Sequence, residues 1–210
     1  MAEVKQNGIV VSPSIGSGDT TLQVKAETVN RGNRVAQLAS FEVEGAGVAV
    51  KKQFIASHLP ADEFIEFDNK NPAVDKGGGT ITLTGKSNSQ KITFSKGIGN
   101  IIGADIAAIK FTANGVQATS GTNISGDPGA KAKYSFRLTL TAAENETIEA
   151  RTQQIIATAN GGQKATATLN QTAGDPFIEV APTEIDVPQD GSAVQVTVDT
   201  NTTFTVTPKS

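Results

Sequence analysis

The feature that most constrains the fold of this chain is an internal repeat. The stretch 64–95, FIEFDNKNPAVDKGGGTITLTGKSNSQKITFS, returns near the end as 177–210, FIEVAPTEIDVPQDGSAVQVTVDTNTTFTVTPKS. The first copy is followed by a long further stretch and the second by nothing, which predicts half a domain at the C-terminal end. The shared residues recur at a constant offset of 113 (177 − 64): Phe64-Ile65-Glu66 with Phe177-Ile178-Glu179, Gly78 with Gly191, and Asn88 with Asn201.

A second, weaker repeat relates the N-terminal stretch Gly8–Phe54 to Ser125–Gln171. Both contain a turn, an alternating strand, a link with Asn and Arg, and two closing strands, and the order matches Arg34 with Arg151 and Gln53 with Gln171. We call the type that begins at Phe64 the front half and the type that ends at Gln171 the back half. The chain then runs back, front, back, front.

Period-two alternation of apolar and polar residues dominates the chain, as in Tyr134–Leu140 and Ala193–Val198, and predicts strands with one buried face. Gly- and Asn-rich turns separate these runs, and Asn160-Gly161-Gly162 is a clear hairpin signal. Short strands at regular spacing predict an all-β fold of immunoglobulin-like β-sandwiches. One stretch, Gly97–Lys110, is apolar without alternation. A packed connection is favoured there over a ligand loop or a subunit contact.

Three segments follow from the repeats. Residues 1–57 are the back half of a split sandwich, 58–175 a complete central sandwich, and 176–210 the front half that completes the split one. A half-sandwich leaves an apolar face and strand edges open, so the halves must close within one chain or between neighbouring chains. The residues expected at this split-domain interface are Leu22, Val24, Ala26, Val194, Val196, Val198, Phe204 and Val206.

Composition excludes several functions. With 21 acidic and 18 basic residues, a net charge of −3 and no basic block, nucleic-acid binding is not expected. No window approaches the roughly 20 apolar residues of a membrane span, so no membrane partner is expected. The start of the chain has an acid at Glu3 and no long apolar run, which is unlike a signal peptide and favours assembly in a cytoplasm. The chain has no Cys, which excludes disulfides and thiolate metal sites.

The sequence offers no catalytic constellation. Its only histidine, His58, lies in a link between domains, and Glu144 and Glu146 lie in a solvated link. Neither a P-loop nor a nucleophile elbow is present. We therefore expect no enzyme, no catalytic residue, no cofactor and no metal. One cluster of hard oxygen ligands is interpreted as an Asx-rich turn in preference to a calcium site: Asp68, Asn69, Asn71 and Asp75.

Three stretches carry short motifs that are mostly turn chemistry: 7–18, Val48–Gln53 and 180–204. These motifs resemble BACON domains, which are immunoglobulin-like modules common in Bacteroidetes proteins and their phages. The stretch 7–18, NGIVVSPSIGSG, is similar to a mid-domain motif of the family, and Val48–Gln53 is similar to its final strand. The stretch 180–204 resembles the front of the domain, with Phe204 where family members read Trp in Asn-x-x-Trp. The family name implies carbohydrate binding, but the chain has no Trp and one tyrosine, Tyr134, expected in the core or at its rim.

The resemblance implies a function. Domains of this type occur in capsid-decorating, head-fibre and tail proteins of Bacteroidetes phages, including the crAss-like group. This implies a non-enzymatic virion protein, a head-fibre or decoration subunit, assembled in the host cytoplasm. Its partners would be capsid or other virion proteins and further copies of itself, as a dimer or trimer. The alternative is a carbohydrate- or surface-binding adhesion module, with weak glycan contact.

Overall fold

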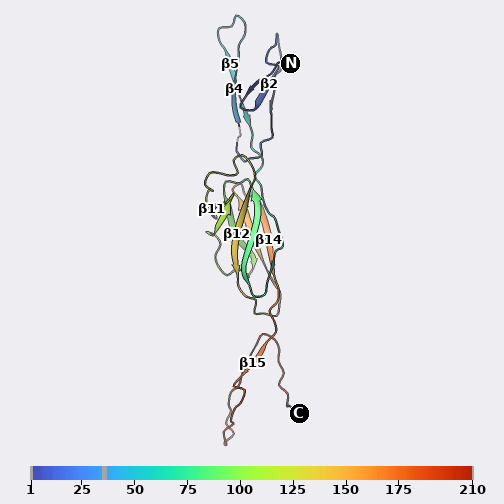
Figure 1. Ribbon diagram of the computed structural model, residues 1–210, viewed down its shortest axis with the longest axis vertical. Coiled ribbons are helices and arrows are strands. Elements are labelled where there is room, and N and C mark those ends of the chain that lie inside the picture. Colours follow the sequence, from blue (N-terminus) through green and yellow to red (C-terminus); the bar gives the residue numbers. More distant parts are fainter. Residues whose placement is uncertain (1, 35–36, 210) are drawn as a thin grey trace.

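The computed structural model describes residues 2–34 and 37–209, and these residues form strands, turns and loops but no helix. The all-β prediction is therefore confirmed, and no helix long and apolar enough to span a membrane occurs in the described part. The molecule is elongated and has three parts in a row (Figure 1). A central β-sandwich lies between an N-terminal part at one end and a C-terminal part at the other.

The central sandwich has two sheets. The first has the strand order β11-β10-β12-β8-β6 and the second the order β7-β14-β13-β9. Their strands are β6 (Ile65–Phe67), β7 (Ala73–Val74), β8 (Gly79–Ser87), β9 (Ile92–Gly99), β10 (Lys110–Ala113), β11 (Val116–Thr119), β12 (Tyr134–Ala142), β13 (Arg151–Ala159) and β14 (Lys164–Gln171).

The core between these sheets arises from the alternation in the sequence. Along β12, the residues at even positions from Tyr134 to Ala142 are buried and those between them are exposed. The ring of Phe94 packs edge-on against Phe111, with 5.1 Å between the ring centroids, and lies beside Phe136, with 5.8 Å between the centroids. Burying one such side chain contributes about 1.5–3 kcal/mol.

The apolar stretch Gly97–Lys110 closes one side of this core. Ile101, Ile102 and Ile106 are all buried in it, and the stretch after β9 forms turns and bends. The predicted packed connection is confirmed.

The front and back halves of the central sandwich meet along three strand pairs. The front half supplies β6 to β9 and the back half β12 to β14, and we include β10 and β11, which precede the predicted repeat Ser125–Gln171, in the back half. Strand β8 pairs with β12 along all nine residues of each, β9 pairs with β13, and β7 pairs in parallel with β14. Each sheet therefore contains strands of both halves, and neither half has a complete sheet by itself.

The N-terminal part has the elements of a back half. Strands β1 (Val4–Gln6), β2 (Ile9–Ser12) and β3 (Gln23–Ala26) form one sheet, and β4 (Gln37–Val43) and β5 (Lys52–His58) form a hairpin. The Asn7-Gly8 turn between β1 and β2 has φ values of 49° and 72°, close to 49° and 79° at Asn114-Gly115 between β10 and β11. One pairing differs, because β3 pairs with β2 whereas β12 pairs with β10.

The C-terminal part has the hairpin of a front half. Strand β15 (Ile178–Ala181) pairs with β16 (Thr197–Thr200) in the register of β6 and β8. Ile178 lies opposite Thr200, as Ile65 lies opposite Ser87 at an offset of 113. The last residue of the predicted front half, Ser210, lies outside the described residues.

The two end parts lie at opposite ends of the central sandwich (Figure 1). The side chains predicted at the split-domain interface therefore form two separate groups within one chain. Leu22, Val24 and Ala26 belong to the N-terminal part, and the remaining five belong to the C-terminal part. Closure of the split sandwich within a single chain, one of the two alternatives, is not the arrangement of this structure.

Candidate functional site

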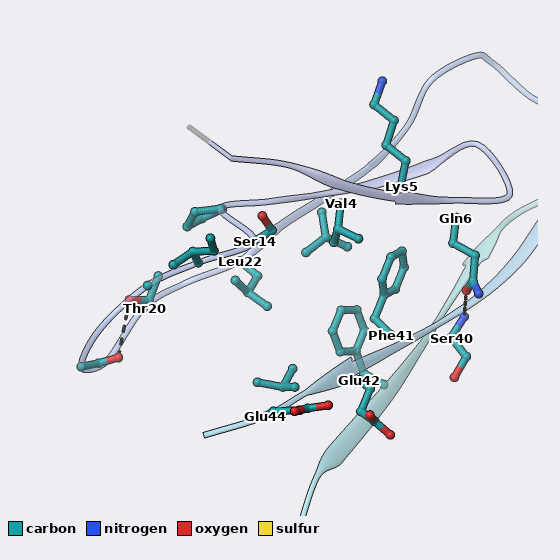
Figure 2. Close-up of a pocket in the computed structure, with 17 residues that line it drawn as sticks. Val4, Lys5, Gln6, Ser14, Thr20, Leu22, Ser40, Phe41, Glu42 and Glu44 are labelled. Carbon is teal, nitrogen blue, oxygen red and sulfur yellow. Dashed lines mark hydrogen bonds between the residues drawn. The ribbon is translucent and has the colours of Figure 1, made fainter. Parts of the chain in front are cut away.

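A groove separates the two sheets of the N-terminal part, and polar and charged residues such as Lys5, Glu42 and Glu44 line it beside the apolar ones. It has a volume of about 690 Å³, and Val4, Val11 and Leu22 line one side while Phe41 and Phe54 line the other. Figure 2 shows the labelled side chains of Val4, Leu22 and Phe41 around this space. The Phe41 and Phe54 rings stack at 5.3 Å. A small core of Ile9, Val11, Ala39 and Phe41 forms the closed end, and the remainder is open.

The strand edges beside this groove are also open. Strand β3 pairs only with β2, and β4 only with β5, among the strands described. The equivalent edges in the central sandwich are covered by the front half, since β12 pairs with β8 and β13 with β9. The open edges leave Leu22 37% and Val24 47% exposed. Neither edge therefore has a partner strand in the part of the chain that the structure describes.

The C-terminal part exposes apolar residues whose counterparts in the central sandwich are buried. Val194 and Val196 are 39% and 42% exposed, while their counterparts Ile81 and Leu83 in the central sandwich are buried at 8% and 3%. Residues 182–196 and 201–209 contain no strand, although their counterparts include β7, most of β8 and β9. These are the segments that pair with a back half in the central sandwich. The β15–β16 hairpin, in which both strands come from the C-terminal part itself, is the strand pairing that this part contains among the described residues.

One asparagine organises the front half of the central sandwich. The Oδ1 atom of Asn88 accepts a hydrogen bond from the Phe64 amide at 2.7 Å, and its Nδ2 atom donates to the Asp62 carbonyl at 2.9 Å. The Ser87 hydroxyl donates to the Phe64 carbonyl at 2.8 Å. These bonds fix where the chain enters β6.

The C-terminal part repeats this network. Asn201 accepts from the Phe177 amide at 3.1 Å and donates to the Asp175 carbonyl at 2.9 Å. The Thr200 hydroxyl donates to the Phe177 carbonyl at 2.6 Å, in place of Ser87. Every partner is displaced by 113 residues, so the β15–β16 hairpin is anchored in the same way as β6 and β8.

A second asparagine organises each back half. Asn145 donates to the carbonyls of Glu149 and Thr172 at 2.8 and 2.9 Å, and accepts from the Thr147 amide. It is buried, and it holds the link before β13 against the end of β14.

Asn30 has the same role in the N-terminal part. It donates to the carbonyls of Arg34 and Leu59 at 2.6 and 2.9 Å, and accepts from the Gly32 amide at 2.9 Å. The backbone amide of Asn30 donates to Nε2 of His58 at 3.2 Å. His58, which the sequence placed in a link between domains, is the last residue of β5. The sequence matched the links that contain Asn30 and Asn145, but it did not show that the two asparagines have the same structural role. Their common signal is an Asn placed shortly before an Arg.

One backbone hydrogen bond recurs next to both junctions between the three parts. At the N-terminal junction, the Ala61 amide donates to the Gly32 carbonyl at 2.8 Å, as the Gly174 amide donates to the Thr147 carbonyl at 2.7 Å at the other junction. Two further bonds hold the parts in line. The Asn33 amide donates to the Gly129 carbonyl at 2.9 Å, and Asn201 Nδ2 donates to the Glu146 carbonyl at 2.7 Å.

The remaining candidates from the sequence have structural roles. Tyr134 is buried and its hydroxyl donates to the Ser89 carbonyl at 2.7 Å. Burial raises the pKa of Tyr134 to about 12. Asn69 and Asp75 accept amide hydrogen bonds from residues two positions ahead, as expected for Asx turns. No group of three or more His, Asp or Glu side chains able to hold a metal occurs in the described part.

Comparisons with known proteins give no family. No family model matches the chain, and no curated protein matches it. Among solved structures, a Bacteroides ovatus GH5 xyloglucanase in complex with a XXXG heptasaccharide has a TM-score of 0.33 and 12% identity. The match covers 54% of this chain and 19% of the enzyme chain.

A second similar structure is an NMR structure of a protein from Bacteroides thetaiotaomicron. It has a TM-score of 0.28 and 14% identity, and the match covers 55% of this chain and 91% of that one. Likenesses at these scores carry no conclusion about function.

Proposed function

We propose that this chain is a non-enzymatic structural protein of a virion, a head-fibre or capsid-decoration subunit of a phage. The observation that carries the proposal is the in-line row of parts with an open sandwich half at each end (Figure 1). A row of sandwiches held by repeated junction contacts is a way to build length. Its open ends are places for attachment to other subunits. The resemblance to BACON-type domains of Bacteroidetes phages supports the same function.

The side chains of the central sandwich support a structural role. Its buried polar residues, such as Asn88, Asn145, Gln153 and Gln171, have hydrogen bonds to the backbone of neighbouring loops. Buried polar groups with satisfied bonds fix loops in place. A second hollow, lined by Asp68, Thr84 and Arg137 among others, has a volume of about 400 Å³ and lies on the outer face of the first sheet.

The alternative adhesion module has weaker support. Stacking of sugar rings on a protein usually needs an exposed Trp or Tyr, and the one tyrosine is in the core. A structural role is therefore favoured over the binding of sugars.

Quantitative mass spectrometry of purified phage particles tests the proposed function. We expect the chain in a fixed ratio to the major capsid protein, and antibody labelling on the particle surface. Absence from particles, together with specific binding of the purified protein on a glycan array, would favour the adhesion module instead.

A further inference from the structure

We propose that the C-terminal part of one copy enters the N-terminal groove of a second copy and completes a composite sandwich. The composite would resemble the central sandwich, with the front half from one chain and the back half from the other. Copies would then join head to tail. This inference rests on the two open halves and does not depend on a virion role.

Within the described ranges 2–34 and 37–209, the N-terminal part lacks the strands of a front half, and the C-terminal part lacks the strands of a back half. The N-terminal part has a groove and open edges on β3 and β4 where a front half would pair. The C-terminal part has a preformed front half whose pairing segments have no strand partner among the described residues. The central sandwich shows how such halves fit, through β8 on β12 and β9 on β13. Completing both would bury apolar surface and pair open strand edges.

The register of β8 and β12 in the central sandwich predicts which residues would pair in the composite. In the central sandwich Leu83 lies opposite Leu138, and Gly85 lies opposite Phe136. The offset of 113 relates Leu83 and Gly85 to Val196 and Val198. Asn30 and Asn145 are 115 residues apart (145 − 30), which would relate Leu138 and Phe136 to the polar Gln23 and Thr21. A shift of one residue towards Asn30 brings the apolar positions into phase and relates Leu138 and Phe136 to Val24 and Leu22. The pairs expected in the composite are therefore Val196 with Val24, Val198 with Leu22, and Val194 with Ala26.

The sizes of these side chains agree with the register. Where the central sandwich combines a glycine with the large Phe136, the composite combines Val198 with the smaller Leu22. Since sheet interiors are packed without voids, a larger residue on one strand requires a smaller one opposite. The complementary change on two distant segments is what mutual contact would require.

The last strand of the central front half carries two large apolar residues that have counterparts in the C-terminal part. In β9, Ile92 and Phe94 are completely buried beside β13. The C-terminal part has a similar apolar pair, Phe204 and Val206, one residue closer to its asparagine. Both are half or more exposed in the single chain. In the composite they would lie beside β4, where the groove contains Phe41.

The geometry determines the type of assembly. Neighbouring parts of this chain lie in line at both ends of the central sandwich (Figure 1), and hydrogen bonds such as Asn33 to Gly129 and Asn201 to Glu146 join them. A composite with the same junctions would continue that line, with all chains running in one direction. Such an interface joins two different surfaces and does not close on itself, so it gives an open row of copies rather than a closed dimer or trimer.

A glycine provides a selective probe of this contact. A Cβ atom added at Gly78 would lie 2.5 Å from the Ala142 carbonyl oxygen, which belongs to the back half. Its counterpart Gly191 has φ +74° and no atom within 4 Å of an added Cβ. In the composite, a Cβ at Gly191 would meet the backbone of the partner copy just before its Asn30.

Cysteine cross-linking in the full chain tests the pairing directly, because the native chain contains no Cys. We expect the double variant Val24→Cys/Val196→Cys to form a ladder of covalent multimers on mild oxidation. A mixture of the two single variants should give a heterodimer in excess of either homodimer. The control pair Val24→Cys/Ile98→Cys, with Ile98 exposed on the central sandwich, should give no ladder. A bond formed only within single chains, or multimers equal to the control, would overturn the proposal.

Gly191→Ala tests the same contact without a cross-link. Light scattering of the native chain across a dilution series should show a mass that rises with concentration. Gly191→Ala should weaken this association at least about tenfold, because the added methyl group clashes only in the composite. The matched control is Gly162→Ala, since Gly162 also has a positive φ (+92°) and free space, but lies in the central β13–β14 turn. Equal association of both variants, or a native chain that stays monomeric throughout, would contradict the proposal.

Discussion

The central and C-terminal front halves differ in how much of the same pattern becomes strand. Both have the hairpin in one register and the asparagine network displaced by 113 residues. Only the central copy has the strands β7 and β9 and the full length of β8. The local contacts of a front half therefore form from its own residues, whereas its long strands need a back half to pair with. Alternation predicts which face of a strand is apolar, but a partner strand is needed to form the sheet.

The two front halves also differ in how far their apolar side chains are buried, and therefore in how much these side chains contribute to stability. Leu83 is 3% exposed while its counterpart Val196 is 42% exposed, although both alternate with polar neighbours. Fully burying an aliphatic side chain contributes about 1.5–3 kcal/mol relative to leaving it exposed. The end parts leave much of this contribution unused in a single chain.

Truncation of a core residue in each region should show the largest difference. Phe136→Ala should destabilise the central sandwich by about 3–5 kcal/mol, because a buried ring in contact with Phe67 and Phe94 leaves a cavity. Leu22→Ala, at the position we relate to Phe136, should cost less than about 1 kcal/mol in dilute solution because the side chain is partly exposed. Denaturant unfolding at low protein concentration measures both. A large cost for Leu22→Ala there would mean that the N-terminal groove is already closed in a single chain.

High pH should destabilise the central sandwich through Tyr134. Burial raises the pKa of this tyrosine to about 12 in the folded chain, above the ordinary value of 10.0. The unfolded chain therefore loses the phenol proton first, and stability falls as pH rises from 10 towards 12. The loss attributable to this group is on the order of 2 kcal/mol.

The variant Tyr134→Phe isolates this contribution. It should be less stable than the native chain at pH 8, since the hydrogen bond to Ser89 is lost, and the difference should shrink or reverse by pH 12. Unfolding curves at several pH values measure it. A constant difference between pH 8 and pH 12 would show that Tyr134 does not titrate as its burial implies. The back half at the N-terminal end contains no tyrosine, so the effect belongs to the central sandwich.

The front-half repeat was predictable from sequence because its anchors are identical residues at constant spacing. The Phe-Ile-Glu entry, the turn glycine and the asparagine all reappear in equivalent contacts. The hairpin at Asn160-Gly161-Gly162 is also confirmed, since it joins β13 to β14. These features depend on local backbone requirements, which short motifs record directly.

The back-half repeat was predicted in order but not in residue pairs. The match of Gln53 with Gln171 is wrong, because Gln53 lies near the start of β5 while Gln171 ends β14. The residue at the end of β5 is His58. Alternation with period two tells which face is buried, yet it leaves the position along the strand open by two-residue steps. The buried Asn30 fixes that position, and a single Asn in a loop gives little sequence signal.

The placement of the end parts could not be predicted from linker length. Links of a few residues fit side-by-side halves as well as an in-line row. The arrangement depends on junction hydrogen bonds such as Asn33 to Gly129 and Asn201 to Glu146. These contacts involve backbone carbonyls, which every sequence provides, so their pairing has no signature in residue types.

The smallest expected difference concerns the paired asparagines. Asn88→Ala should destabilise the central sandwich by about 1–3 kcal/mol, because it leaves the partly buried Phe64 amide without its acceptor. Asn201→Ala removes the equivalent bonds, together with the junction bond to Glu146, from an exposed hairpin, where water replaces them, and should cost less than about 1 kcal/mol in a dilute monomer. If the two halves associate between copies, the cost of Asn201→Ala should grow with protein concentration, since the residue then organises a packed front half. Thermal melting at two concentrations a hundredfold apart measures this. A cost that stays small at both would separate the formation of the hairpin from the association of the copies.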